Sequence, residues 1–151
     1  MNLMKIFAID TNILVYAHNS DSLLHESAKI FMETVMNQRD EKGNLGICIP
    51  AQVLIEFISV ITSKKLKTPL SISQATEIVQ DYLDTEITIL MQKETYLTNT
   101  IELLEKVTSR KRIFDVAIAA ILKDNQVSGI YTVDVDDFKD FTFLEAINPL
   151  S

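Results

Sequence analysis

Two short apolar runs, each followed by an aspartate, constrain the fold of this chain more than any other feature. Residues 6–9 read Ile-Phe-Ala-Ile and lead into Asp10, and residues 129–133 lead into Asp134. Continuous apolar runs of this length that contain β-branched residues are typical of strands buried on both faces of a parallel sheet. Ligand sites of α/β folds lie at the carboxyl ends of such strands. The sequence therefore predicts that both aspartates lie at the carboxyl edge of a sheet.

The rest of the chain alternates between helical and strand-like patterns. We expect helices over residues 13–17, 22–37, 51–66, 72–83, 95–107 and 113–122, and strands over residues 6–9, 45–49, 86–91, 129–133 and 141–147. Ser71 and Gln74 have the spacing of a capping box at the start of the fourth helix. Strands that alternate with helices predict an α/β fold, a three-layer α/β/α sandwich around a mostly parallel sheet of four or five strands.

Length and composition indicate one domain over residues 1–151, because 151 residues with 47% apolar content are enough for one sizeable core. No apolar run reaches the length of a membrane span, and the first ten residues lack the apolar stretch of a secretory signal. We therefore expect a cytoplasmic protein. The net charge of −7 argues against binding nucleic acid by bulk electrostatics, but not against acids gathered around a bound cation.

Four carboxylates stand out by position: Asp10 and Asp134 after strands, and Glu56 and Asp115 inside apolar helices. The helix around Glu56 is expected to be buried on nearly all sides, so this carboxylate needs a cation, a hydrogen-bond network or a bound proton. Each acid also has a simpler interpretation. Asp10 could cap the following helix, Asp115 could be a helix N-cap, Asp134 and Asp137 could be turn residues, and Glu56 could pair with a buried base.

The four acids together favour a metal site. Carboxylates of like charge do not cluster in an apolar setting without a cation, and oxygen ligands suit Mg²⁺ or Mn²⁺. Two histidines and one cysteine leave few ligands for zinc. Acid-rich sites for divalent cations most often serve phosphoryl chemistry. Thr11, Asn12 and Thr132 adjoin the acids and could orient them through hydrogen bonds.

These residues, in this order and spacing, carry a resemblance that covers essentially the whole chain. Its parts are Asp10-Thr11-Asn12 after an apolar strand, the isolated Glu56, the run Phe-Asp-Val-Ala-Ile-Ala-Ala over residues 114–120, and Thr132-Val133-Asp134 followed by Asp137-Phe138. The ordered set resembles a PIN domain, in particular the VapC-type ribonuclease toxins of type II toxin–antitoxin systems.

The resemblance implies a site in which Asp10, Glu56, Asp115 and Asp134 gather at the carboxyl edge of the sheet. They would bind one or two Mg²⁺ or Mn²⁺ ions and hydrolyse an RNA phosphodiester bond with a water activated by the metal. Asp10 and Asp115 are the expected principal ligands. Asp134 and Glu56 would complete the site, partly through waters, and Glu56 could also accept a proton from the attacking water. Thr132 resembles the hydroxyl that steadies this site, and Asp137 is either a further site acid or the cap of a short helix.

The resemblance also implies partners: an RNA substrate, a small antitoxin protein that places a basic residue at the acids, and a second copy of the chain in a homodimer. Arg110 and Arg112 precede the helix that contains Asp115, where we expect them to contact RNA phosphates. Two alternatives stay open. One is a PIN-like module that binds a metal or a partner without nuclease turnover, and the other is a housekeeping RNA-processing nuclease outside any toxin–antitoxin pair.

Overall fold

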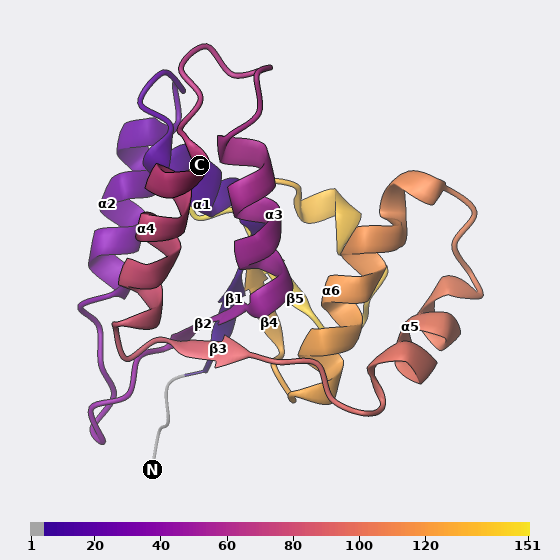
Figure 1. The fold of residues 1–151 in the computed structure, drawn as a ribbon. Helices are drawn as coiled ribbons and strands as arrows, with labels where there is room; N and C mark the ends of the chain where they lie inside the picture. The colour runs from indigo at the N-terminus through magenta and orange to yellow at the C-terminus, as the bar shows by residue number, and fades with distance from the viewer. Residues whose placement is uncertain (1–4) are drawn as a thin grey trace.

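The runs predicted as strands form one five-stranded sheet in the computed structural model, which describes residues 5–151 (Figure 1). Its strands are β1 (Phe7–Ile9), β2 (Ile47–Pro50), β3 (Thr88–Leu90), β4 (Gly129–Tyr131) and β5 (Glu145–Ile147). The strand order is β3-β2-β1-β4-β5, and every neighbouring pair is parallel. The expected α/β class with a central sheet of up to five strands is thereby confirmed.

Six helices connect the strands: α1 (Thr11–His18), α2 (His25–Val35), α3 (Ala51–Ile61), α4 (Ile72–Leu83), α5 (Tyr96–Leu104) and α6 (Ile113–Asp124). The chain moves outward from β1 to β2 and β3 and then crosses back to β4. Because crossovers between parallel strands are right-handed, this reversal places α5 and α6 on the sheet face opposite α1 to α4. Figure 1 shows α5 and α6 (orange) grouped apart from the four earlier helices. None of these helices, across the part of the chain the structure describes, is long and apolar enough to cross a membrane.

The core lies between the sheet and both helix layers. Ile9 of β1, Ile49 of β2 and Ile130 of β4 are fully buried, as is every residue of α6 from Val116 to Leu122 within a few per cent. The small side chains of Ala117, Ala119 and Ala120 allow this close approach of α6 to the sheet. The residues directly after β1 and β4, Asp10 and Thr132, are therefore attached to strands that are packed in the core.

The helix predicted over residues 51–66 is shorter and less buried than expected. α3 ends at Ile61, where the Thr62 hydroxyl donates a hydrogen bond to the Ile58 carbonyl at 2.7 Å. Ile55 and Val60 are 68% and 41% exposed, so the expectation of burial on all sides was wrong. An apolar composition shows that a helix has a large apolar surface, but not that neighbouring elements cover all of it.

Other predicted boundaries differ by a few residues, mostly because the strands are shorter than their apolar runs. The capping box of Ser71 and Gln74 is present at the start of α4. The run 141–147 contributes only β5 at its end, because residues 141–144 form a turn ahead of that strand, in which the Leu144 N–H donates to the Phe141 carbonyl at 2.9 Å. Two short 3₁₀ helices, η1 (Arg110–Arg112) and η2 (Val135–Asp137), flank the carboxyl edge near α6 and β4.

Candidate active site

The four predicted acids line one open cavity of about 450 Å³ at the carboxyl edge of the sheet. Asp10 follows β1, Glu56 lies on α3, Asp115 lies in the first turn of α6, and Asp134 follows β4. Residues that are far apart in the sequence therefore meet where β1 and β4 end side by side. Thr11 and Asn12 line the same cavity.

Asp10 is the most buried of these acids, with 7% of its surface exposed. One carboxylate oxygen, Oδ1, accepts a hydrogen bond from the Thr11 backbone N–H at 2.7 Å, and Asp10 is also the N-cap of α1. The other oxygen, Oδ2, accepts from the Thr132 hydroxyl at 2.7 Å and from the Asn12 amide at 3.5 Å. Asp10 therefore both caps a helix and presents a fixed carboxylate to the cavity.

Asn12 and Thr132 join the segment after β1 to the segment after β4. The Asn12 amide nitrogen donates to Thr132 Oγ1 and to Asp134 Oδ2, each at 3.2 Å, while its carbonyl oxygen accepts from the Val133 N–H at 3.2 Å. The buried Thr132 hydroxyl also accepts from the Asp134 N–H at 3.1 Å. Asn12 and Thr132 thus form hydrogen bonds with Asp10 and Asp134.

Glu56 is half-buried and faces the cavity, held by residues on two helices. The Thr11 hydroxyl donates to Glu56 Oε2 at 2.9 Å, so Thr11 contacts Asp10 through its backbone and Glu56 through its side chain. Gln52, one turn earlier on α3, donates to Glu56 Oε1 at 3.3 Å. Gln52 is a residue that the sequence analysis missed. Its only sequence signal is the spacing of four residues from Glu56, which is common on helices.

The site concentrates negative charge, and none of its four acids forms an ion pair with a described basic side chain. Burial raises the pKa of Asp10 to about 6, the hydrogen bonds from Thr132 and Thr11 oppose that rise, and the charges of Glu56 and Asp134 add to it. Across residues 5–151 the two ion pairs are Arg39–Glu86 and Arg112–Asp140, and neither involves an acid of the cavity.

Asp115 has a more strongly raised pKa, about 7. Burial is the main cause, followed by the nearby charges of Asp137, Asp10 and Glu56, and the charge of Arg112 opposes the rise. A cation bound in the cavity would relieve this repulsion.

The donor chemistry of the site fits a hard divalent cation. Every candidate ligand is a carboxylate oxygen, which is the donor type that Mg²⁺ and Mn²⁺ prefer. Within the described residues, no three acidic, histidine or cysteine side chains lie close enough together to hold an ion by themselves. Magnesium commonly uses only one or two protein carboxylates and completes its shell with waters and substrate phosphates. The residues present therefore fit an ion held by few carboxylates.

Two of the simpler interpretations of the acids were wrong. Asp115 is the third residue of α6 and Arg112 occupies the N-cap position, so Asp115 is not a helix cap. Asp137 is the last residue of η2 and does not cap it. Its charge is nonetheless the largest electrostatic influence on the pKa of Asp115, although Asp137 does not line the cavity.

The arginines before α6 differ from each other in their surroundings. Arg112 donates to Asp140 Oδ2 at 3.1 Å and to the Asp137 carbonyl at 3.0 Å, and its guanidinium lies 5.7 Å from the centre of the Phe141 ring. These contacts join η1 to the segment after η2. They are made by the Arg112 guanidinium, the group that we expected to contact RNA phosphates. Arg110 is exposed at the start of η1.

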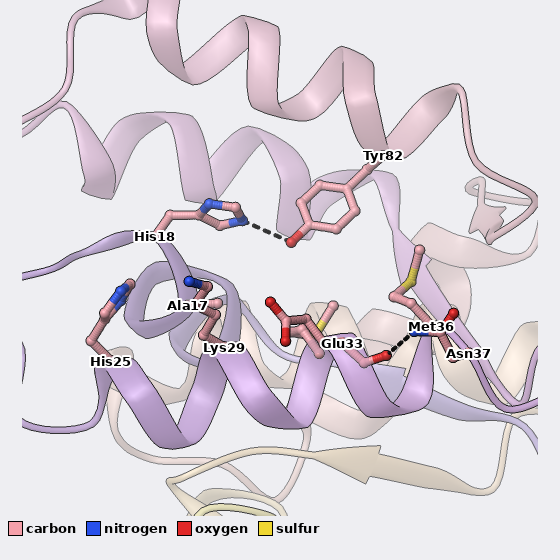
Figure 2. Close-up of a pocket in the computed structure, with 9 residues that line it drawn as sticks. Ala17, His18, His25, Lys29, Glu33, Met36, Asn37 and Tyr82 are labelled. Atoms are coloured by element: carbon pink, nitrogen blue, oxygen red, sulfur yellow. Dashed lines mark hydrogen bonds between the residues drawn. The ribbon is translucent and has the colours of Figure 1, made fainter.

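A second cavity, of about 520 Å³, lies beside α1, α2 and α4 and lacks the acidic cluster (Figure 2). His18 Nε2 and the Tyr82 hydroxyl are 2.8 Å apart there, and the His18 ring packs edge-on against Phe57. Burial lowers the pKa of His18. The Glu33 carboxylate is the only acid that lines this cavity. His18 therefore joins α1 to α4, and the acidic cavity remains the candidate active site.

Replacing Thr132 with valine should destabilise the protein by about 1–3 kcal/mol, because the isosteric side chain removes the donor to Asp10 and the acceptor for Asn12. Thr132→Ser keeps the hydroxyl and is the matched control. Urea unfolding at pH 7.5 measures both variants. A valine variant as stable as the wild type would show that the hydroxyl contributes nothing.

Comparisons with known proteins agree with the fold. The sequence profile of the PIN domain matches residues 7–144. Ribonuclease VapC24 of Mycobacterium tuberculosis is 27% identical over 149 residues, which is 97% of this chain and 98% of that protein.

Solved structures of similar fold include VapC20 of Mycobacterium tuberculosis, described as a sarcin-ricin loop cleaving toxin. Its TM-score is 0.66 at 14% identity, over 87% of this chain and 92% of VapC20. VapBC-1 from nontypeable Haemophilus influenzae has a TM-score of 0.64 at 16% identity, over 97% of this chain and 99% of that one. Likeness at such identities shows the fold alone. The profile match, however, spans nearly the entire sheet and all four acids, and the chain belongs to the PIN domain family.

Proposed function

We propose that this protein is a metal-dependent endoribonuclease and the toxin of a VapBC-type toxin–antitoxin pair, acting in the cytoplasm. The observation that carries the proposal is the convergence of Asp10, Glu56, Asp115 and Asp134 on one open cavity, where none of them forms an ion pair with a described basic side chain. A relative of similar length, 27% identical, is named as a ribonuclease, which supports RNA as the substrate.

Each side chain has a role that follows from its surroundings. Asp10 and Asp115 hold one or two Mg²⁺ or Mn²⁺ ions, since they are the acids whose ionised forms are most disfavoured without a cation. Asp134 contributes through waters and is oriented by Asn12. When bound, a divalent cation would neutralise the negative charge of the phosphate oxygens and lower the pKa of the attacking water.

Glu56 accepts the proton of the attacking water in this proposal, because it faces the cavity and both its oxygens are held in place by hydrogen bonds. The water oxygen forms a bond to phosphorus, one P–O ester bond breaks, and the departing oxygen takes up a proton. Arg110, exposed at the amino end of α6, is proposed to contact an RNA phosphate outside the cavity.

The proposed partners are RNA, a small antitoxin and a second copy of the chain. VapBC2 from Rickettsia felis is described as bound to a DNA fragment from the promoter of its own genes; its TM-score to this chain is 0.63 at 22% identity. A basic residue of an antitoxin would be attracted to the acidic cavity for the same electrostatic reason as a metal ion. Large apolar side chains exposed on the single chain, among them Ile55, Leu97 and Phe114, leave apolar surface for a protein partner.

The test is cleavage of total cellular RNA by the purified protein with Mn²⁺ or Mg²⁺, after chelation with EDTA, and after restoring the ion. We expect cleavage only with the ion present. Cleavage that persists in EDTA would contradict metal dependence. Manganese binding without cleavage would instead identify a binding module.

Induced expression in a bacterial host separates the two remaining nuclease classes. We expect growth arrest, and we expect Asp10→Asn to relieve it. Cleavage in the test tube without growth arrest would identify a housekeeping nuclease.

A further inference from the structure

We infer that Gln52 and Tyr96 position Glu56, and that α5 is thereby part of the support of the active site. The activity test of this inference rests on the proposed ribonuclease function. Neither residue stood out in the sequence, and Tyr96 belongs to a helix that contributes no acid to the cavity.

A chain of side-chain hydrogen bonds reaches Glu56 from α5. The Tyr96 hydroxyl donates to Gln52 Oε1 at 3.4 Å, and Gln52 Nε2 donates to Glu56 Oε1 at 3.3 Å. The direction of these bonds is consistent: the Gln52 amide must offer N–H to a carboxylate, which leaves its oxygen facing the Tyr96 hydroxyl. Gln52 thus joins a donor on α5 to the acid on α3.

The opposite oxygen of Glu56 accepts a hydrogen bond from the Thr11 hydroxyl on α1 at 2.9 Å. A glutamate on a helix surface can rotate about three side-chain bonds, so one hydrogen bond leaves its carboxylate free to turn. Two donors, one on each oxygen, fix the plane of the carboxylate toward the cavity. A proton acceptor or a metal ligand needs this placement, because small displacements cost large factors in rate.

Tyr96 is itself held in place by α6. The Thr95 hydroxyl donates to Asp124 Oδ1 at 3.0 Å, and the Asn99 amide donates to the same oxygen. Asp124 is the last residue of α6, and Asp115 lies in the first turn of the same helix. One helix therefore carries Asp115 at its amino end and, through α5, sets the position of Glu56 from its carboxyl end.

A pair with the same spacing on α4 provides a matched control. Gln80 Nε2 donates to Asp84 Oδ1 at 3.0 Å. Both residues are exposed, and neither lines the acidic cavity. Gln80→Leu removes an equivalent glutamine–acid bond, and Tyr82→Phe removes an equivalent tyrosine hydroxyl that contacts His18. Effects specific to Glu56 should appear only in Gln52→Leu and Tyr96→Phe.

The experiment measures two properties of the full chain: initial rates on total cellular RNA at limiting and saturating RNA, and Mn²⁺ affinity by titration calorimetry. We expect Gln52→Leu to lower the saturated rate about 10-fold and Tyr96→Phe about 3-fold, with little change in the RNA concentration needed for half-saturation. Gln52→Leu should also weaken Mn²⁺ binding about 3-fold. Gln80→Leu and Tyr82→Phe should match the wild type in both measurements.

A role through Glu56 predicts that Gln52→Leu has no further effect in a Glu56→Gln background. The inference is overturned if Gln52→Leu matches Gln80→Leu in both measurements, or if its loss persists in that background. A wild type that cleaves no RNA would refute the proposed function, and the manganese titration would still test the positioning of Glu56.

Discussion

Asp10→Asn is expected to lower RNA cleavage at least about 1,000-fold, which corresponds to about 4 kcal/mol of transition-state stabilisation. Asp10 is 7% exposed, and the Thr11 N–H, the Thr132 hydroxyl and the Asn12 amide fix its carboxylate. The substitution keeps the shape of the side chain and removes the charge that attracts a divalent cation. Initial rates on total cellular RNA with saturating Mn²⁺ measure the loss.

Asp136→Asn is the matched control for this prediction. Asp136 is exposed on η2, two residues after Asp134, and does not line the acidic cavity. The control substitution removes the same charge from a position two residues after Asp134 and outside the cavity. We expect Asp136→Asn to retain most of the activity. An Asp10→Asn variant within tenfold of the wild type would show that Asp10 is not a principal ligand.

The sequence allowed the fold class to be predicted because buried parallel strands leave a strong local signal. The runs before Asp10 and Asp134 are mostly apolar, and they contain β1 and β4 at the centre of the sheet. Edge elements gave a weaker signal. β5 occupies only the last residues of the run 141–147, because residues 141–144 form a turn that the Leu144 N–H closes by donating to the Phe141 carbonyl at 2.9 Å.

The convergence of the acids could be predicted because charged side chains stand out next to buried strands and within apolar helices. An aspartate directly after a buried strand and a glutamate within an apolar helix both carry an energetic cost that hydrogen bonds or a bound cation must offset. The reason given for Glu56 was partly wrong, however. α3 leaves Ile55 and Val60 exposed, so Glu56 lies at the border of a cavity and not inside an apolar layer.

Supporting residues were harder to find because their roles depend on contacts between distant segments. Gln52 and Tyr96 are 44 residues apart, and each is unremarkable on its own helix. Arg112 shows a related difficulty, and its contact with RNA stays a prediction. Its place before α6 suggested contact with RNA, but Asp140, the Asp137 carbonyl and the Phe141 ring surround its guanidinium. A basic residue near an active site has several possible partners, and the sequence does not rank them.

The buried charge of Asp10 should make the metal-free protein less stable as the pH rises. Its pKa is about 6 in the folded protein, above the usual 3.8, with burial as the main cause. A carboxyl group with a raised folded pKa binds protons more tightly when folded, so its contribution favours folding at low pH. That contribution is lost progressively as the pH rises from about 4 to about 6. The full effect corresponds to about 3 kcal/mol, of which about 2 falls between pH 4.5 and 7.5.

Asp10→Asn removes this dependence, so we expect the unfolding free energy of the variant relative to wild type to increase by about 2 kcal/mol from pH 4.5 to pH 7.5 in EDTA. Urea unfolding at both pH values measures the difference, in which groups that do not interact with Asp10 cancel. Loss of the Asp10 charge also lowers the pKa of Asp115 toward its usual value, which changes the difference in the same direction. Asp136→Asn, an exposed acid, should show no such change. Saturating Mn²⁺ at pH 7.5 should stabilise the wild type and not Asp10→Asn, because a ligand that binds only the folded state shifts the equilibrium toward it. A relative stability of Asp10→Asn that is independent of pH would mean that Asp10 is not strained by its charge, and that a cation is not needed to hold it there.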